Sequence, residues 1–119
     1  MTKQELFDKA VKGLKEQGFI QSMRGKQCAY RGYAGRKCLI GHLITDEEYH
    51  PAMETKNAFF ICERYPRLAH LKPHSYFLKS LQEVHDNHPT PDAMVHGLRI
   101  FAADHNLDVS ELEECPATE

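Results

Sequence analysis

Apolar residues recur at three- and four-residue steps at both ends of the chain, and this helical periodicity stops between residues 19 and 45. At the N-terminus the periodic residues are Leu6, Phe7, Ala10, Val11 and Leu14. Thr2 and Glu5 have the spacing of a capping box, and Gly18 is well placed to end the helix. The pattern therefore predicts an amphipathic helix over residues 2–17 with one face in a core.

The C-terminal half predicts two further helices joined by a short connection. Ser75 can cap a helix that runs to about His88, and its apolar stripe contains Phe77, Leu81 and Val84. Thr90 can cap the next helix, which continues to about His105, because Pro91 suits a first helical position. The short connection favours antiparallel packing of the two helices.

Shorter elements are expected between these long helices. Thr45 and Glu48 repeat the capping-box spacing, which predicts a short helix over residues 46–50. Residues 54–65 form another helical candidate, and the segment from Pro66 to Pro73 predicts a loop.

The aperiodic stretch predicts a β-hairpin. Gln27–Arg31 and Arg36–Ile40 are short runs of residues compatible with strands, and Gly32–Gly35 would join them. An isolated hairpin is marginal in water, so we expect this one to pack on the helices.

Length and composition place these elements in one domain. The chain has 119 residues, of which 41% are hydrophobic and 27% charged, and this excludes a disordered chain and a collagen-like fibre. No apolar run approaches the ~18 residues of a spanning helix, so a membrane protein is also excluded. We expect a mostly helical α+β domain of four to five helices over residues 1–107. A small antiparallel hairpin is expected near residues 27–40, and an acidic tail or short final helix over residues 108–119.

Two further expectations concern the setting of the protein. The N-terminus lacks the apolar stretch of a signal peptide, which predicts a cytoplasmic protein. The broad apolar faces of the C-terminal helices would permit a homodimer.

Several local patterns resemble a family of small uncharacterised proteins from phages and bacterial genomes, over roughly residues 6–107. The patterns are Cys28-x-Tyr30-Arg31, Gly35-x-Lys37-Cys38-x-x-Gly41-x-Leu43-Ile44-x-Asp46-x-x-Tyr49, Met53-Glu54 and Leu81-Gln82-x-x-His85-Asp86. The resemblance implies a phage or prophage accessory protein, of a kind that often binds a host macromolecule or a signalling molecule. It assigns no functional residue.

Charge is segregated along the chain. No acidic residue lies between Gln17 and Thr45, whereas residues 108–119 hold five acids and no base. The acid-free stretch contains Arg24, Lys26, Arg31, Arg36 and Lys37, with Tyr30 and Tyr33 among them. Cations bind phosphates and exposed rings stack on bases.

This segregation suggests a non-enzymatic binding protein that recognises a nucleic acid, a nucleotide or an acidic host protein. The candidate ligand-binding residues are Tyr30, Arg31, Tyr33, Arg36 and Lys37. The alternative is a solvated loop whose charges keep a hairpin edge from aggregating.

A zinc-stabilised interaction module is a second hypothesis. Cys28 and Cys38 would lie nearly opposite each other on the expected hairpin, and His42 follows closely. One of Cys62, His70 or His74 would complete the tetrahedron. The chain has no Cys-x-x-Cys pair, so the alternative is that the cysteines are buried and act as small apolar groups.

A metal-dependent phosphohydrolase is a third hypothesis. Adjacent His85 and Asp86 on a helix match part of the metal-binding signature of such enzymes, and the chain holds eight histidines. The alternative is a partly buried histidine that bonds a neighbour, because His85 shares a helical stripe with Leu78 and Leu81.

Overall fold

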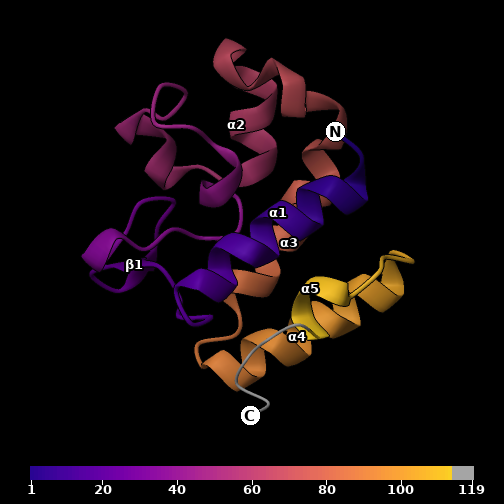
Figure 1. The fold of residues 1–119 in the computed structure, drawn as a ribbon. Coiled ribbons are helices and arrows are strands. Elements are labelled where there is room, and N and C mark those ends of the chain that lie inside the picture. Colours follow the sequence, from indigo (N-terminus) through magenta and orange to yellow (C-terminus); the bar gives the residue numbers. More distant parts are fainter. Residues whose placement is uncertain (114–119) are drawn as a thin grey trace.

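The computed structural model describes residues 1–113, and Figure 1 shows a mostly helical α+β arrangement with a very small sheet. The helices and strands are α1 (Lys3–Glu16), β1 (Met23–Arg24), β2 (Gln27–Cys28), α2 (Ala58–Arg64), α3 (Ser75–Asp86), α4 (Pro91–Asp104) and α5 (Ser110–Glu113). The expected fold class is confirmed. Within the described part of the chain, no helix is long and apolar enough to cross a membrane.

Helix α1 forms as its pattern predicts. The Thr2 hydroxyl accepts a hydrogen bond from the Glu5 amide at 3.1 Å, and the Glu5 carboxylate accepts one from the Thr2 amide at 2.7 Å. All five periodic apolar residues are buried. Gly18 adopts a φ of +77°, a left-handed conformation that costs glycine little, and the chain turns away from the helix there.

The core lies where α1, α3 and α4 meet, with α3 behind α1 in Figure 1. Leu78 and Leu81 of α3 and Met94 and Leu98 of α4 are fully buried in one cluster with the apolar face of α1. The Thr90 hydroxyl caps α4 by accepting a hydrogen bond from the Ala93 amide at 3.2 Å, as predicted. Helix α5 packs on α1, so the two ends of the described chain are in contact.

The segment before α3 is helical, where a loop was predicted. Two 3-10 turns, separated by a kink at Leu68, span Pro66–His74 and lead directly into α3. Ser75 therefore does not cap α3 as predicted, and its hydroxyl donates instead to the Lys72 carbonyl at 2.7 Å.

The predicted positions of the strands are wrong. Met23 pairs with Cys28 and Arg24 with Gln27, so the turn falls at Gly25-Lys26 and the second predicted strand, Arg36–Ile40, is absent. The side-chain amide of Gln17 replaces a strand partner at Lys37, donating to its carbonyl at 2.7 Å and accepting from its amide at 3.1 Å.

The predicted helix over residues 46–50 is a single turn, although Thr45 and Glu48 form the reciprocal bonds of a capping box. A 3-10 helix, Pro51–Thr55, follows it. Helix α2 then begins later than the predicted residue 54, because the Asn57 side chain caps it at the Phe60 amide.

The predicted C-terminal tail is described only in part. Residues 110–113 form α5, a short final helix. The remainder, residues 114–119, lies outside the described residues.

Candidate functional site

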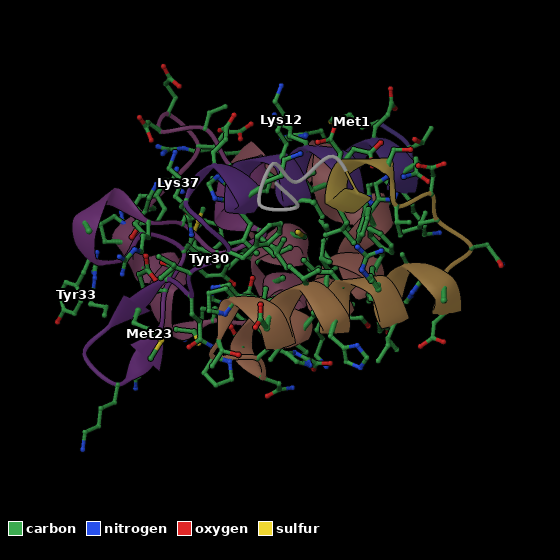
Figure 2. The ribbon with its side chains drawn as sticks, turned by 60° about the horizontal axis from the view of Figure 1, so that its bottom comes forward. Met1, Lys12, Met23, Tyr30, Tyr33 and Lys37 are labelled. Carbon is green, nitrogen blue, oxygen red and sulfur yellow. The ribbon has the colours of Figure 1, made fainter. Side chains whose placement is uncertain are left out.

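Residues 18–44, here called the acid-free segment, form the irregular end of the molecule that contains β1 and β2 (Figures 1 and 2). Five predicted ligand-binding residues lie in it, and the structure divides them into two groups. Tyr30 is buried and the half-buried Arg31 side chain bonds neighbouring carbonyls, whereas Tyr33 is exposed and Arg36 and Lys37 are half-buried.

Tyr30 belongs to the core. Its side chain is only 4% exposed, and its hydroxyl donates to the Lys56 carbonyl at 2.7 Å. Burial raises the pKa of this phenol above its usual range. The ring therefore anchors the acid-free segment and does not present a face for stacking.

Arg31 holds neighbouring backbone in place. Its guanidinium donates to the carbonyls of Gly41 and Ile44 at 2.9 and 2.8 Å, and it lies 4.8 Å from the centre of the Tyr49 ring. An ion pair with Asp46 at 3.3 Å completes its contacts. These bonds give Arg31 a structural role.

The surface group extends further than the predicted set. Tyr33 is 61% exposed and lies beside the hairpin turn, since its hydroxyl accepts a hydrogen bond from the Gly25 amide at 2.9 Å. Figure 2 shows Tyr33 pointing away from the end of the molecule, with Lys37 on the same lobe. Arg24 and Lys26 on the hairpin are also exposed. We call Arg24, Lys26, Tyr33, Arg36 and Lys37 the basic surface.

The predicted zinc ligands are not brought together. Among residues 1–113, Cys28, Cys38 and His42 do not form a cluster with metal-binding spacing. The Cys38 thiol is buried and accepts a hydrogen bond from the Gly41 amide at 3.2 Å. The His42 ring bonds Gln17 at 3.1 Å and packs so tightly on Gly13 that a Cβ there would lie 2.4 Å from the ring.

The structure instead places Cys28 beside His85 and Asp86, with one ligand atom of each within 4.8 Å of the others. His85 is completely buried, and both of its ring nitrogens have partners. The Ser22 amide donates to Nε2 at 3.0 Å, and Nδ1 lies 2.9 Å from an Asp86 carboxylate oxygen. Because a backbone N–H can only donate, Nε2 is the acceptor and Nδ1 carries the hydrogen.

This hydrogen-bonding pattern disfavours a metal at the cluster. A metal needs a ring nitrogen with a free lone pair, and neither nitrogen of His85 offers one without losing a bond. Burial, together with the charge of Asp86, raises the pKa of the Cys28 thiol to about 12, so the thiolate form is also disfavoured. His85 instead connects the acid-free segment to α3.

Most other histidines have comparable structural roles. Hydrogen-bond partners are present for His42, His50, His70, His74, His88 and His105. His88, for example, bonds the Val84 carbonyl at 2.6 Å and packs on Gly97 of α4. The high histidine content is thus accounted for by local hydrogen bonding and packing.

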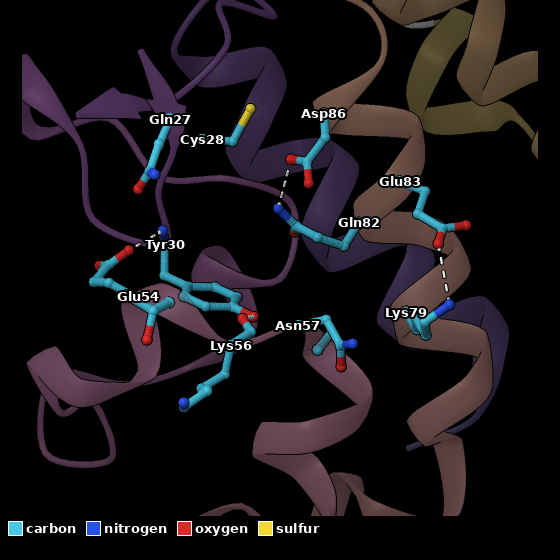
Figure 3. Close-up of a pocket in the computed structure, with 12 residues that line it drawn as sticks. Gln27, Cys28, Tyr30, Glu54, Lys56, Asn57, Lys79, Gln82, Glu83 and Asp86 are labelled. Carbon is cyan, nitrogen blue, oxygen red and sulfur yellow. Dashed lines mark hydrogen bonds and ion pairs between the residues drawn. The ribbon is translucent and has the colours of Figure 1, made fainter. Parts of the chain in front are cut away.

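A cavity of about 520 Å³ lies between β2, the start of α2 and α3 (Figure 3). Cys28 and Tyr30 line it from the acid-free segment, and Gln82 and Asp86 line it from α3. The Glu54 carboxylate borders the cavity and accepts the amide hydrogens of Tyr30 and Arg31 at 2.9 and 3.1 Å, and the Tyr49 hydroxyl at 2.5 Å. Sequence reasoning missed this cavity, because its walls come from three separate segments of the chain.

The chain matches no protein-family model, no curated protein and no solved structure.

Proposed function

We propose that this protein binds single-stranded nucleic acid through the basic surface, without catalysis. Its setting as a phage or prophage accessory protein is part of the same proposal. The observation that carries it is the charge segregation. The segment of 27 residues, 18–44, contains no acid, and its basic surface carries four cations, Arg24, Lys26, Arg36 and Lys37, together with the exposed Tyr33.

The chemistry of the basic surface fits a phosphate backbone. Lysine and arginine neutralise phosphates and release counterions, which favours binding without requiring a particular base sequence. An exposed tyrosine stacks on an unpaired base, and such stacking contributes about 1–3 kcal/mol per base. Tyr33 is held beside the hairpin turn by the Gly25 amide, so its ring is pre-positioned among the cations.

A single-stranded ligand is favoured over an acidic protein surface because of this tyrosine. An acidic protein would need only the cations, whereas an unpaired base makes use of both cation and ring.

The test compares two double variants with the same change in charge. Lys26→Glu with Arg36→Glu alters the basic surface, and Lys9→Glu with Lys12→Glu alters the exposed face of α1. Arg31 is left intact, because its bonds to Gly41 and Ile44 hold the fold. Binding is measured by fluorescence anisotropy with a labelled DNA strand of about a dozen nucleotides.

The basic-surface variant should bind the DNA strand at least about tenfold more weakly than the parent protein. The slope of the logarithm of its binding constant against the logarithm of the salt concentration should become shallower by about 0.7 for each phosphate contact that is lost. The α1 variant should stay within about twofold of the parent protein. Equal binding by both variants, or no binding by the parent protein at low salt, overturns the proposal. Capture of an acidic protein in place of DNA would also overturn it.

A further inference from the structure

We propose that the sulfur atoms of Met23 and Cys28 bind Cu(I), a soft monovalent cation. The two residues are partners in the antiparallel pairing of β1 with β2, at the end of the hairpin away from its turn. Neither residue belongs to the basic surface, so the proposal is independent of nucleic-acid binding.

The first observation is the distance between the two sulfur atoms. Cys28 Sγ lies 3.6 Å from Met23 Sδ, and both side chains are half-buried. Cross-strand partners project from the same face of a sheet, which brings the thiol and the thioether together. The methionine side chain has three rotatable bonds, so its sulfur can adjust to an ion bound at the thiol. One ion can therefore contact both sulfur atoms while the strands stay paired.

The second observation is the chemistry of the groups beside this sulfur pair. His85 lies close to the Cys28 thiol. Its ring nitrogens are already bonded to the Ser22 amide and the Asp86 carboxylate, so the ring is not available as a ligand. Zn(II) in a structural site takes four ligands, whereas thiolate and thioether donors favour Cu(I), which accepts a low coordination number. The bonds that disfavour zinc therefore leave a sulfur site that fits Cu(I).

The third observation is a proton acceptor beside the thiol. Cys28 keeps its hydrogen at neutral pH, because burial and the charge of Asp86 raise its pKa to about 12. A cation that binds the sulfur must therefore displace this hydrogen. The Asp86 carboxylate hydrogen-bonds to the thiol and is exposed, so it can accept the proton and pass it to water.

The binding step needs no change of oxidation state. The S–H bond of Cys28 breaks, and its electron pair forms the bond between sulfur and copper. The proton moves to the Asp86 carboxylate and then to water. A lone pair of Met23 Sδ forms the second bond to the ion, which remains Cu(I). The net charge at the hairpin is unchanged, because one proton leaves as one monovalent cation enters.

The experiment titrates the reduced, full-length protein with Cu(I) without oxygen, in competition with the chromophoric chelator bicinchoninate. Cys115, which lies outside the described residues, is replaced by serine in every sample so that its thiol does not contribute. The protein should take up one Cu(I) per chain, because the Cys38 and Cys62 thiols are buried. Amide chemical shifts in NMR spectra should change most at Met23 and Cys28.

Met23→Leu keeps the size of the side chain and removes its sulfur, so Cu(I) should bind at least about tenfold more weakly. Cys28→Ser should abolish the uptake. Met94→Leu is the matched control, since it makes the same substitution in the core of α4 and should leave the Cu(I) affinity unchanged. Thermal melting verifies that the variants fold, and Cys28→Ala replaces the serine variant if that one does not.

Unchanged Cu(I) affinity in Met23→Leu overturns the proposal, because the ion would then be held by the thiol alone. Uptake that persists in both Cys28 variants, or no uptake by the protein that carries only the Cys115 substitution, also overturns it. Excess Zn(II) should not displace the copper. Displacement by Zn(II) would indicate a centre that includes His85, and this too would contradict the sulfur site.

Discussion

The backbone hydrogen bonds of helix α3 and those of the acid-free segment have different kinds of partner. In α3 the backbone groups bond within the helix, and Leu78 and Leu81 bury one face. In the acid-free segment, many backbone groups bond to side chains from elsewhere. Glu54 accepts the amides of Tyr30 and Arg31, and the Gln17 amide pairs with Lys37.

The difference shows where each region is sensitive to substitution. A helix loses little when one exposed side chain changes, because its hydrogen bonds are local to the backbone. The acid-free segment relies on a few polar side chains, and removing one leaves several buried groups without partners. Its stability is therefore concentrated in residues such as Glu54, which a hydrophobicity pattern does not indicate.

The largest expected effect is at Glu54. Glu54→Ala removes the acceptor of two backbone amides and the Tyr49 hydroxyl, and it should lower the free energy of unfolding by about 3 kcal/mol or more. Glu47→Ala, at an exposed acid of the same region, should change it by less than about 0.5 kcal/mol. Urea denaturation measures both, and similar values would contradict the comparison.

Two glycines test the regions with the same substitution. A Cβ at Gly41 would lie 2.3 Å from the backbone oxygen of Tyr30, so Gly41→Ala should cost about 2–3 kcal/mol. A Cβ at Gly97 in α4 would meet the His88 ring at 2.7 Å. That side chain can shift, and alanine favours the helix by about 1 kcal/mol, so Gly97→Ala should cost less than about 1 kcal/mol. The reverse order in chemical denaturation would show that the acid-free segment is the more adaptable region.

Two buried thiols report on local opening. Cys38 in the acid-free segment and Cys62 in α2 are 0% and 1% exposed, and burial raises the pKa of each to about 12. Their intrinsic reactivity is thus similar, and labelling rates in the folded protein depend mainly on opening. We expect Cys38 to be alkylated about tenfold faster than Cys62 in dilute urea, as measured by peptide mass spectrometry. Equal rates would mean that both regions open together.

The smallest expected effect is a pH dependence at His42. Burial first, and then Lys37 and Arg31, lower the pKa of His42 from 6.5 to about 4. The His42 ring of the unfolded chain takes up a proton at a higher pH than the ring of the folded chain. The contribution of neutral His42 to the free energy of unfolding is therefore fully present above pH 6.5. It is lost as the pH falls from 6.5 to about 4.

Partial exposure of the ring limits that contribution to about 1–2 kcal/mol. The parent protein should therefore lose more stability than His42→Gln between pH 7 and pH 4.5, as measured by urea denaturation. His96→Gln, at an exposed histidine, should behave as the parent protein does. An identical pH dependence in the parent and His42→Gln would show that His42 does not carry the effect.

Features encoded by neighbouring residues were predictable. The Thr2–Glu5 capping box and the Thr90-Pro91 helix start depend on contacts within one turn, and both are formed. The hairpin was misplaced because its register depends on distant groups. Cys38, Leu39 and Ile40 are all fully buried, which does not fit the two-residue alternation of a half-exposed strand.

In the candidate site, too, features that depend on neighbouring residues were predictable and features that depend on distant residues were not. The acid-free stretch was visible in the sequence, but nothing local distinguished the half-buried, internally bonded Arg31 from the exposed Lys26. The zinc and phosphohydrolase hypotheses each named part of one cluster. Cys28 meets His85 and Asp86 only because the fold brings β2 against the end of α3.

The α+β class, the long helices with their caps and the segregation of charge could all be predicted from the amino-acid sequence, because each depends on residues close together in the chain. Tertiary structure alone decided which polar side chains are bonded inside and which face solvent. It also created the cavity beside Gln82, whose walls meet only after packing. These features depend on the tertiary structure because a buried polar group bonds partners far away in sequence, as between Ser22 and His85.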